Sequence, residues 1–243
     1  MYHDVYVKDT SESGFQNSTA LKYKVRADKF ETQVAAVAEA VRNGLLVKEA
    51  IVFTFDDGGV SFNTVAAPIL EKYGMRGLFF IATKYIDMPG FLNKEQVAQL
   101  AERGHLVGSH SHTHPERISI LSKDEIASEW QTSQAILTEI LGQTPQIASI
   151  PNGYSSSAVL KVMSEAGIRE IHTSEPTTKR SRKYDSEIVG RYAVTDDFTT
   201  AQVMAIATDA ATRHKMALRS QVLGVAKTIL GPLYLVIRKI LIK

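Results

Sequence analysis

Short apolar runs alternate with helix-like segments over most of the chain, and this alternation constrains the fold more than any other feature of the sequence. Runs with the length and composition of buried strands occupy residues 51–55, 77–82, 105–109, 146–150 and 168–173. Segments with helical signals occupy residues 28–42, 62–73, 93–103, 122–141 and 156–165, with capping boxes expected at Asp28 with Glu31, Asn93 with Gln96, and Ser122 with Glu125. Strands that alternate with helices predict an α/β fold with a parallel sheet, and five such units favour a barrel or partial barrel.

The size and composition are ordinary for a soluble globular protein. The chain has 243 residues, of which 44% are hydrophobic and 22% are charged. We expect one domain over residues 1–215 and an apolar, basic tail over residues 216–243. The formal net charge of +2 gives no electrostatic case for nucleic acid as a partner.

Two polar motifs follow predicted strands directly. Thr-Phe-Asp-Asp-Gly occupies residues 54–58, and His-Ser-His-Thr-His occupies residues 110–114. Parallel α/β folds place their chemistry at the carboxyl ends of the strands, so we expect the two motifs to lie close together. Because the chain has no cysteine, a metal ion bound there must use His, Asp or Glu.

The spacing within these motifs suits a catalytic metal. His110 and His114 are four residues apart, which on a helical turn puts both imidazoles on one face as two ligands. Asp57 would be the third ligand, whereas Asp56 would diverge from it in extended backbone and stay free as a base. His112 alternates away from the pair and is expected to have a supporting or structural role. Either motif alone is a weak signal, but together they predict a metal-bound water beside a carboxylate, which can hydrolyse an unreactive carbonyl.

Both motifs resemble those of the polysaccharide deacetylases of carbohydrate esterase family 4, which share the NodB homology domain. The family's first motif is unchanged at residues 54–58, and its second, His-Ser/Thr-x-x-His, is present at residues 110–114. The resemblance implies a distorted (β/α) barrel, a divalent metal ion, usually zinc, and removal of acetyl groups from N-acetylated or O-acetylated sugars of an oligo- or polysaccharide. Carried over by position, it implies Asp56 as the general base and, as metal ligands, Asp57, His110 and His114.

The resemblance weakens after residue 150. The family's third motif, of the Arg-Pro-Pro-Tyr type, is represented by Ile-Pro-Asn-Gly-Tyr at residues 150–154, where Pro151 fits and the arginine is missing. The resemblance implies that a backbone amide of this loop, that of Gly153 or Tyr154, helps to hold the oxyanion. Arg191 is the candidate to replace the arginine that steadies the base, and a surface arginine is the alternative. The fourth motif is not recognisable.

The family's fifth motif, Leu-x-x-His-Asp, is absent near the C-terminus, and a similar element opens the chain at residues 1–5. This order resembles the exopolysaccharide and poly-N-acetylglucosamine deacetylases, whose barrel is circularly permuted, and Ser-Gly-Phe at residues 13–15 resembles the same branch. His3 then becomes the candidate general acid, with His172 as the alternative. A disordered N-terminus is the alternative structural interpretation.

The sequence therefore predicts a metal-dependent carbohydrate deacetylase in which Asp56 takes a proton from metal-bound water and His3 protonates the leaving amine. Two other classes stay open. The degraded third and fourth motifs are compatible with a catalytically inactive barrel that binds glycans. The tail is compatible with a membrane-docked accessory protein of polysaccharide synthesis.

The tail and one internal segment complete the expectations. From residue 218 onward the chain is apolar, basic and free of acidic residues, which suits either an anionic membrane surface or a helix packed on the barrel. The N-terminus lacks a basic region followed by a long apolar run, so we expect no secretory signal and a cytoplasmic location, peripheral on the inner membrane if the tail binds lipid. Residues 177–185 are polar and basic and predict a mobile loop.

Overall fold

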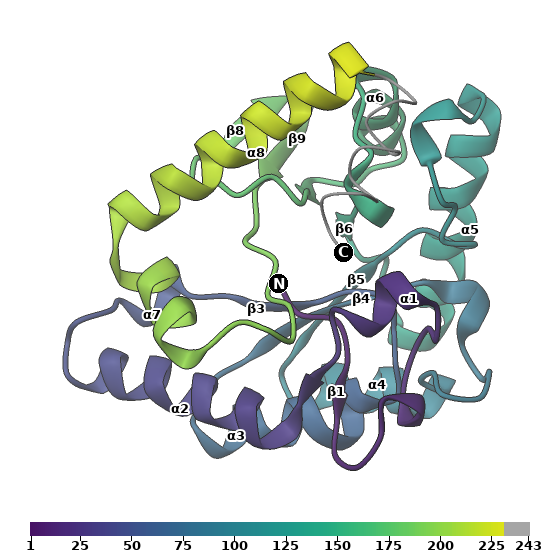
Figure 1. Cartoon of the computed structure of the whole chain (residues 1–243). Coiled ribbons are helices and arrows are strands. Elements are labelled where there is room, and N and C mark those ends of the chain that lie inside the picture. The colour runs from purple at the N-terminus through teal and green to yellow at the C-terminus, as the bar shows by residue number, and fades with distance from the viewer. Residues whose placement is uncertain (231–243) are drawn as a thin grey trace.

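A seven-stranded sheet forms the centre of the molecule. The computed structural model describes residues 1–230, with side chains as far as residue 222 (Figure 1). The strands are β3 (Phe53–Phe55), β4 (Gly77–Ile81), β5 (Leu106–Ser109), β6 (Ile147–Ser149), β7 (Glu170–His172), β8 (Ser181–Lys183) and β9 (Ser186–Val189). They lie in the order β3-β4-β5-β6-β7-β9-β8, and every neighbouring pair is parallel except β8 with β9. The predicted α/β architecture with a parallel sheet is confirmed.

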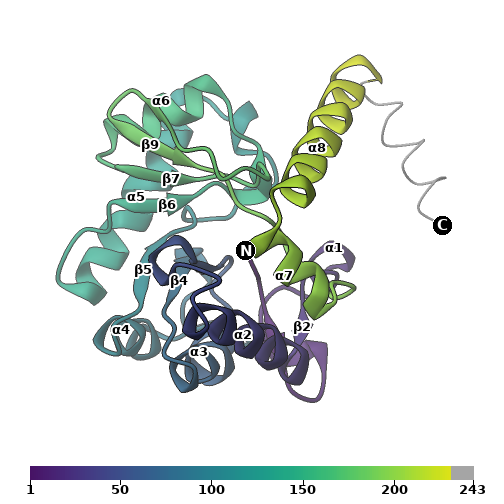
Figure 2. The same ribbon diagram turned by 90° about the vertical axis from the view of Figure 1, so that its left-hand side faces the viewer.

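Helices surround the sheet (Figures 1 and 2). They are α1 (Ser18–Leu21), α2 (Ala27–Arg42), α3 (Ala67–Lys72), α4 (Lys94–Glu102), α5 (Lys123–Leu141), α6 (Ser157–Glu165), α7 (Thr200–Thr208) and α8 (Ala210–Leu230), and a π-helical segment (Phe62–Ala66) leads into α3. The capping boxes predicted at Asn93 and Ser122 are present. The one predicted at Asp28 is wrong, because β2 (Val25–Arg26) runs directly into α2 and leaves Asp28 in the first turn, paired with Arg26.

The N-terminal segment completes the wall of the barrel. The amide of Tyr2 donates to the carbonyl of Thr54 (2.7 Å), and the amide of Asp56 donates to the carbonyl of Tyr2 (3.1 Å). On the other side, the amide of Val194 donates to the carbonyl of Met1 (2.9 Å). The segment therefore lies between β3 and the chain that follows β9, near the middle of the view in Figure 1. The alternative of a disordered N-terminus is wrong.

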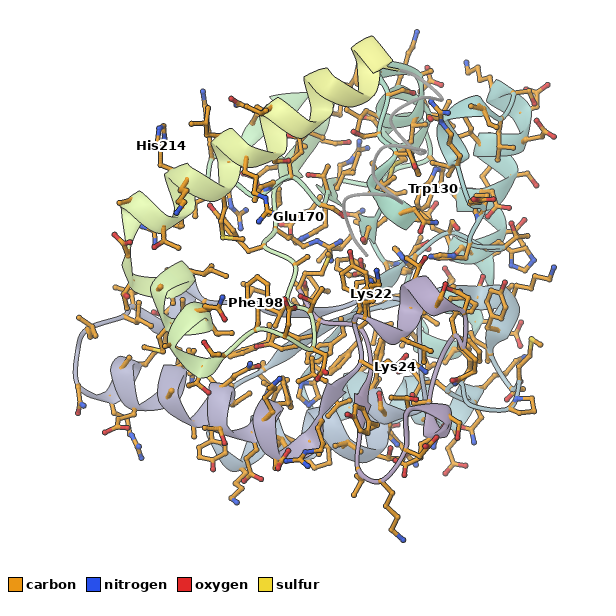
Figure 3. The ribbon with its side chains drawn as sticks, viewed as in Figure 1. Lys22, Lys24, Trp130, Glu170, Phe198 and His214 are labelled. Carbon is orange, nitrogen blue, oxygen red and sulfur yellow. The ribbon has the colours of Figure 1, made fainter. Side chains whose placement is uncertain are left out.

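The interior consists of two apolar clusters. In the first, the rings of Phe55 and Phe79 stack at 4.9 Å, and Tyr2 from the N-terminal segment stacks on Phe55 at 5.7 Å. The second surrounds Trp130 of α5, labelled in Figure 3, and includes Ile171 of β7. The first cluster therefore ties the N-terminal segment to the strand that carries the first motif.

The prediction of a mobile loop over residues 177–185 is wrong for its second half, since only residues 177–180 lack regular structure. Residues Ser181–Lys183 form β8, an antiparallel partner of β9, with Tyr184 at φ +53° in the turn. The amide of Asp185 donates to Ser164 Oγ on α6 (3.1 Å), and Ser186 Oγ donates to the carbonyl of Ile168 (2.7 Å). The residues of β8 are all exposed, so the strand carries none of the apolar alternation by which a sequence reveals one.

Helix α8 runs through the boundary expected between residues 215 and 216. Figure 2 shows it extending away from the sheet. The division of the chain into residues 1–215 and 216–243 therefore stays a prediction, and residues 231–243 of the expected tail lie outside the described residues. Within the described residues, none of the helices has the length and apolar character needed to span a bilayer.

Candidate active site

Both aspartates of the first motif lie close to His110 at the end of β3. Asp57 has a backbone φ of +90°, which is costly for a residue with a side chain and persists only where the surroundings enforce it. As a result, Asp57 Oδ1 lies 3.4 Å from His110 Nε2, and Asp56 Oδ2 lies 4.0 Å from the same nitrogen. The expectation that the two carboxylates diverge in extended backbone is therefore wrong.

The second motif follows β5 as an irregular loop. Ser111 and His114 have φ values of +63° and +54°, so the expected helical turn is not formed. The amide of His114 donates to Ser111 Oγ (3.2 Å), and the loop brings His114 Nε2 to 3.2 Å from Asp57 Oδ1. Both imidazoles therefore contact the same carboxylate, but an irregular loop brings them there instead of the expected helical turn.

Three side chains could hold a metal ion here. The ligand atoms of Asp57, His110 and His114 all lie within 4.8 Å of one another. Since a carbonyl oxygen can only accept, the contact between His110 Nδ1 and the carbonyl of Ser149 (2.9 Å) puts the proton on Nδ1 and leaves the lone pair of Nε2 available to a metal ion. Burial opposes the ionised form of Asp57, but the neighbouring His110 and His114 outweigh it and hold the pKa of Asp57 well below its usual range. The residues present therefore fit a divalent cation.

The other carboxylate, Asp56, is held by Arg191. Arg191 Nη1 donates to Asp56 Oδ1 (2.6 Å) and Nη2 donates to Oδ2 (2.8 Å), and both residues are buried. Ser149 Oγ also donates to Asp56 Oδ2 (3.1 Å), and Arg191 Nε donates to the carbonyl of Thr173 (3.1 Å). Burial favours the neutral carboxyl, but the charge of Arg191 outweighs it, so the pKa of Asp56 lies below its usual range. Asp56 is therefore fixed in place as an ionised carboxylate.

A carboxylate on α5 fixes the loop of the second motif. Glu129 Oε2 accepts hydrogen bonds from the amides of His112 (2.9 Å) and Thr113 (2.8 Å), and Oε1 accepts from Thr113 Oγ1 (2.5 Å). His112 itself turns to Thr83, whose Oγ1 lies 3.0 Å from His112 Nδ1. Neither Glu129 nor Ser149 was singled out from the sequence, because nothing local distinguishes them from other residues of a helix or a strand.

Replacing Glu129 by Gln is expected to weaken metal binding about 10- to 100-fold, because an amide nitrogen would replace one of the oxygens that accept from the loop. The measurement is metal affinity by competition with a chelator. Glu139→Gln is the matched control, since Glu139 lies on the same helix, is exposed and pairs with Lys94. Equal affinities in the two variants would show that Glu129 does not position the ligand loop.

The segment that carries His3 is anchored next to the first motif. Asp4 Oδ1 accepts from Ser13 Oγ (2.6 Å) and from Ser61 Oγ (2.9 Å), and the amide of Ser61 donates to Ser13 Oγ (3.0 Å). Gly59 packs against this network so closely that a Cβ there would lie 1.9 Å from Asp4 Oδ1. The buried network therefore joins the N-terminal segment to the turn that follows Asp57.

Two histidines remain as candidates for proton transfer. The ring of His3 packs against that of Tyr23 at a tilt, with centroids 4.5 Å apart, and its Nδ1 is buried without a hydrogen-bond partner among the described residues. Burial lowers the pKa of His3, and the negative charge of Asp57 partly offsets this. His172 Nε2 lies 2.5 Å from Glu170 Oε1, and burial also lowers the pKa of His172. An unpaired buried nitrogen marks a functional-site candidate, and within the described residues the Nδ1 of His172 is unpaired as well. The two histidines differ because the other ring nitrogen of His172 is already bonded to Glu170.

The loop at residues 150–154 borders the same region. Pro151 is buried, Asn152 has a φ of +55°, and Asn152 Nδ2 lies 3.5 Å from the carbonyl of Pro115, directly after the second motif. The amide of Gly153 donates to the carbonyl of Ile150 (3.3 Å), whereas the Tyr154 amide has no partner in the described part of the chain. The Tyr154 side chain is 43% exposed.

The sequence matches a known family over the region that holds most of these residues. A family model described as polysaccharide deacetylase matches residues 45–171, more than half of the chain. The chain belongs to the polysaccharide deacetylase family. The predicted family and the predicted fold class, the distorted barrel of the NodB type, are confirmed.

Relatives of the polysaccharide deacetylase family match about half of the chain each. YxkH of Bacillus subtilis, which carries a provisional polysaccharide deacetylase name, is 30% identical over 129 residues, 53% of this chain and 46% of its own length. The peptidoglycan-N-acetylglucosamine deacetylase of Bacillus cereus is 25% identical over 131 residues, 54% of this chain and 46% of its own length. The chain thus spans about half the length of these relatives.

A solved structure extends the likeness beyond the family match. The deacetylase PplD of Streptococcus pyogenes, in complex with acetate, superposes with a TM-score of 0.64 at 22% identity, over 85% of this chain and 95% of PplD. At this identity the likeness supports the fold. The circular permutation and the exopolysaccharide branch stay predictions.

Proposed function

We propose that this member of the polysaccharide deacetylase family hydrolyses N-acetyl or O-acetyl groups on the sugars of a polysaccharide or glycan precursor. The observation that carries the proposal is the convergence of Asp57, His110 and His114 beside Asp56, whose carboxylate is clamped by Arg191. Asp57 and the two histidines would hold a divalent ion, and zinc suits two imidazoles and one carboxylate with open positions. When bound, the ion would supply a water of lowered pKa and polarise the acetyl carbonyl.

Asp56 is proposed as the proton acceptor for the attacking water. Its pairing with Arg191 keeps it ionised, and the contact from Ser149 Oγ fixes its orientation. The low pKa of Asp56 makes it a weak base in isolation, and a bound ion that lowers the pKa of the water would make the proton transfer less unfavourable. Arg191 therefore acts by positioning the base.

The amide of Tyr154 is the better of the two proposed oxyanion donors. The Gly153 amide already donates to the carbonyl of Ile150. The Tyr154 amide has no partner among the described residues and could therefore donate to a ligand. A single donor of this kind typically contributes roughly 3–4 kcal/mol to the transition state. The exposed ring of Tyr154 borders this position on the solvent side.

His3 is proposed as the acid that protonates the departing amine, and replacing it by Ala is expected to lower turnover about 100-fold without changing metal content. His172→Ala is the matched variant, and because His172 is bonded to Glu170 we expect it to keep most of the activity. The measurements are acetate release and elemental analysis. A loss confined to His172→Ala would transfer the acid role to that residue.

The test of the function itself is acetate release by the metal-reconstituted protein. The panel contains N-acetylated and O-acetylated oligosaccharides, including oligomers of N-acetylglucosamine. Release from any member that disappears with a chelator and returns with zinc supports the proposal. Binding of these sugars without acetate release, with metal in place, would favour the inactive glycan-binding barrel instead.

Contact of the C-terminal region with a membrane surface stays a proposal. Its support within the described residues is the exposure of Leu218 and Val222 on α8, beside the basic residue Arg219. Exposure of two apolar residues is equally compatible with packing against another protein surface.

A further inference from the structure

Three aromatic side chains gather beside the candidate metal ligands. Phe15, Tyr85 and Phe91, which we call the aromatic wall, come from two segments of the chain, the N-terminal region and the connection between β4 and α4. Phe15 meets Tyr85 edge-on at 4.7 Å and Phe91 at 5.0 Å, and Tyr85 stacks on Phe91 at 5.0 Å. All three rings are partly exposed, in contrast to the fully buried rings of the core.

The aromatic wall adjoins the reaction site directly. The ring of Phe15 lies 5.1 Å from the ring of His114, which in turn lies 5.0 Å from the ring of His110. Tyr85 Oη lies 3.4 Å from the carbonyl of Thr113 in the loop of the second motif. A group bound against the aromatic wall would therefore lie close to the ligands of the candidate metal.

The backbone beneath the wall is held by hydrogen bonds to the first motif. The carbonyl of Gly90 accepts from the amides of Gly14 (2.7 Å) and Val60 (3.0 Å), and the amide of Leu92 donates to the carbonyl of Gly58 (3.0 Å). Phe91 also forms an antiparallel bridge with Gly59. The rings therefore keep a fixed position relative to Asp57, as a preformed binding surface requires.

The chemistry of a sugar matches such a surface. One face of a pyranose ring presents mainly C–H groups, which are slightly positive, and the face of an aromatic ring is negative. Ligand sites typically combine partly exposed aromatic rings with a few polar groups that fix orientation, and here the polar groups are those of the candidate metal site. A role in folding alone would be served equally well by rings withdrawn fully from water.

We propose that the aromatic wall is a sugar-binding subsite, on which a pyranose ring of the glycan stacks while its acetyl group, or that of the neighbouring sugar, enters the metal site. The inference rests on the proposed function, because it assigns the wall to the substrate of that reaction. It identifies Tyr85 and Phe91 as residues that determine the preference for a carbohydrate over other acetylated compounds.

The experiment compares binding of a sugar with hydrolysis of a sugar-free acetyl ester. The probe for binding is the N-acetylglucosamine tetramer, titrated calorimetrically into the full-length protein with a chelator present so that no turnover occurs. The probe for hydrolysis is glycerol triacetate, which has acetyl groups and no ring. The variants are the double substitution Tyr85→Leu with Phe91→Leu, the conservative Tyr85→Phe, and Tyr184→Leu as a control at an exposed tyrosine on the β8–β9 turn.

The double variant is expected to raise the Kd for the tetramer about tenfold, which corresponds to about 1.4 kcal/mol. Its hydrolysis of glycerol triacetate and its melting temperature should match those of the wild type. Tyr85→Phe keeps the ring and removes the hydroxyl, so it should bind the tetramer normally, as should Tyr184→Leu.

Several results would overturn the inference. They are a wild-type protein that does not bind the tetramer, a double variant with unchanged Kd, or a parallel loss of glycerol triacetate hydrolysis and thermal stability, which would make the wall a support for His114. If the wild type binds the tetramer through the wall but releases acetate from no compound, the proposed function fails and the sugar subsite stands.

Discussion

The Asp56→Asn variant should release acetate at least about a hundredfold more slowly than the wild type while it binds the metal ion as well. The amide keeps the shape of the carboxylate but cannot accept the proton of the attacking water. The ligands Asp57, His110 and His114 are unchanged, so metal content by elemental analysis should stay near one ion per chain. Near-normal turnover would show that Asp56 is not the base.

The structure supplies a necessary control for this variant. Asp56 neutralises a buried guanidinium through two hydrogen bonds, so its loss leaves Arg191 unpaired, which typically costs about 3–5 kcal/mol of stability. The double variant Asp56→Asn with Arg191→Met removes the stranded charge. If the single variant has a lower melting temperature than the wild type, the double variant should recover stability and metal binding but not activity. Recovery of activity in the double variant would contradict the assignment.

The His114→Ala variant should lose most of its affinity for the metal ion, by more than about a hundredfold, because removing a ligand should exceed the 10- to 100-fold effect of removing a partner that orients one. His114 Nε2 lies 3.2 Å from Asp57 Oδ1, inside the set of three ligand atoms. Acetate release should fall in parallel. The measurement is elemental analysis after dialysis, with chelator competition for the residual affinity.

His112→Ala is the matched control for that variant. His112 lies two residues away in the same loop, but its Nδ1 faces Thr83 Oγ1 at 3.0 Å and is not part of the ligand set. We therefore expect its metal content to equal that of the wild type. Equal metal content in His114→Ala and His112→Ala would remove His114 from the metal site.

The alternation of strands and helices and the position of the site could be predicted from the sequence for a physical reason. Apolar runs between capped helices indicate buried strands from the local sequence alone. Parallel topology then brings the ends of β3 and β5 to the same edge of the sheet. This is why the proximity of Asp57 to His110 and His114 could be predicted. The prediction failed where no apolar pattern exists, as in β8, whose side chains are all exposed.

The sequence by itself therefore determined the family, the alternating α/β architecture and the residues that meet at its edge. The tertiary structure decided how they meet. Asp57 turns at a positive φ that local preference disfavours, Glu129 reaches the ligand loop from a helix, and Ser149 reaches Asp56 across 93 residues of chain. Each of these depends on a contact between residues far apart in sequence, which leaves no periodicity in the chain. Such contacts become visible only once the packed structure has fixed which buried charges and hydrogen-bonding groups must satisfy one another.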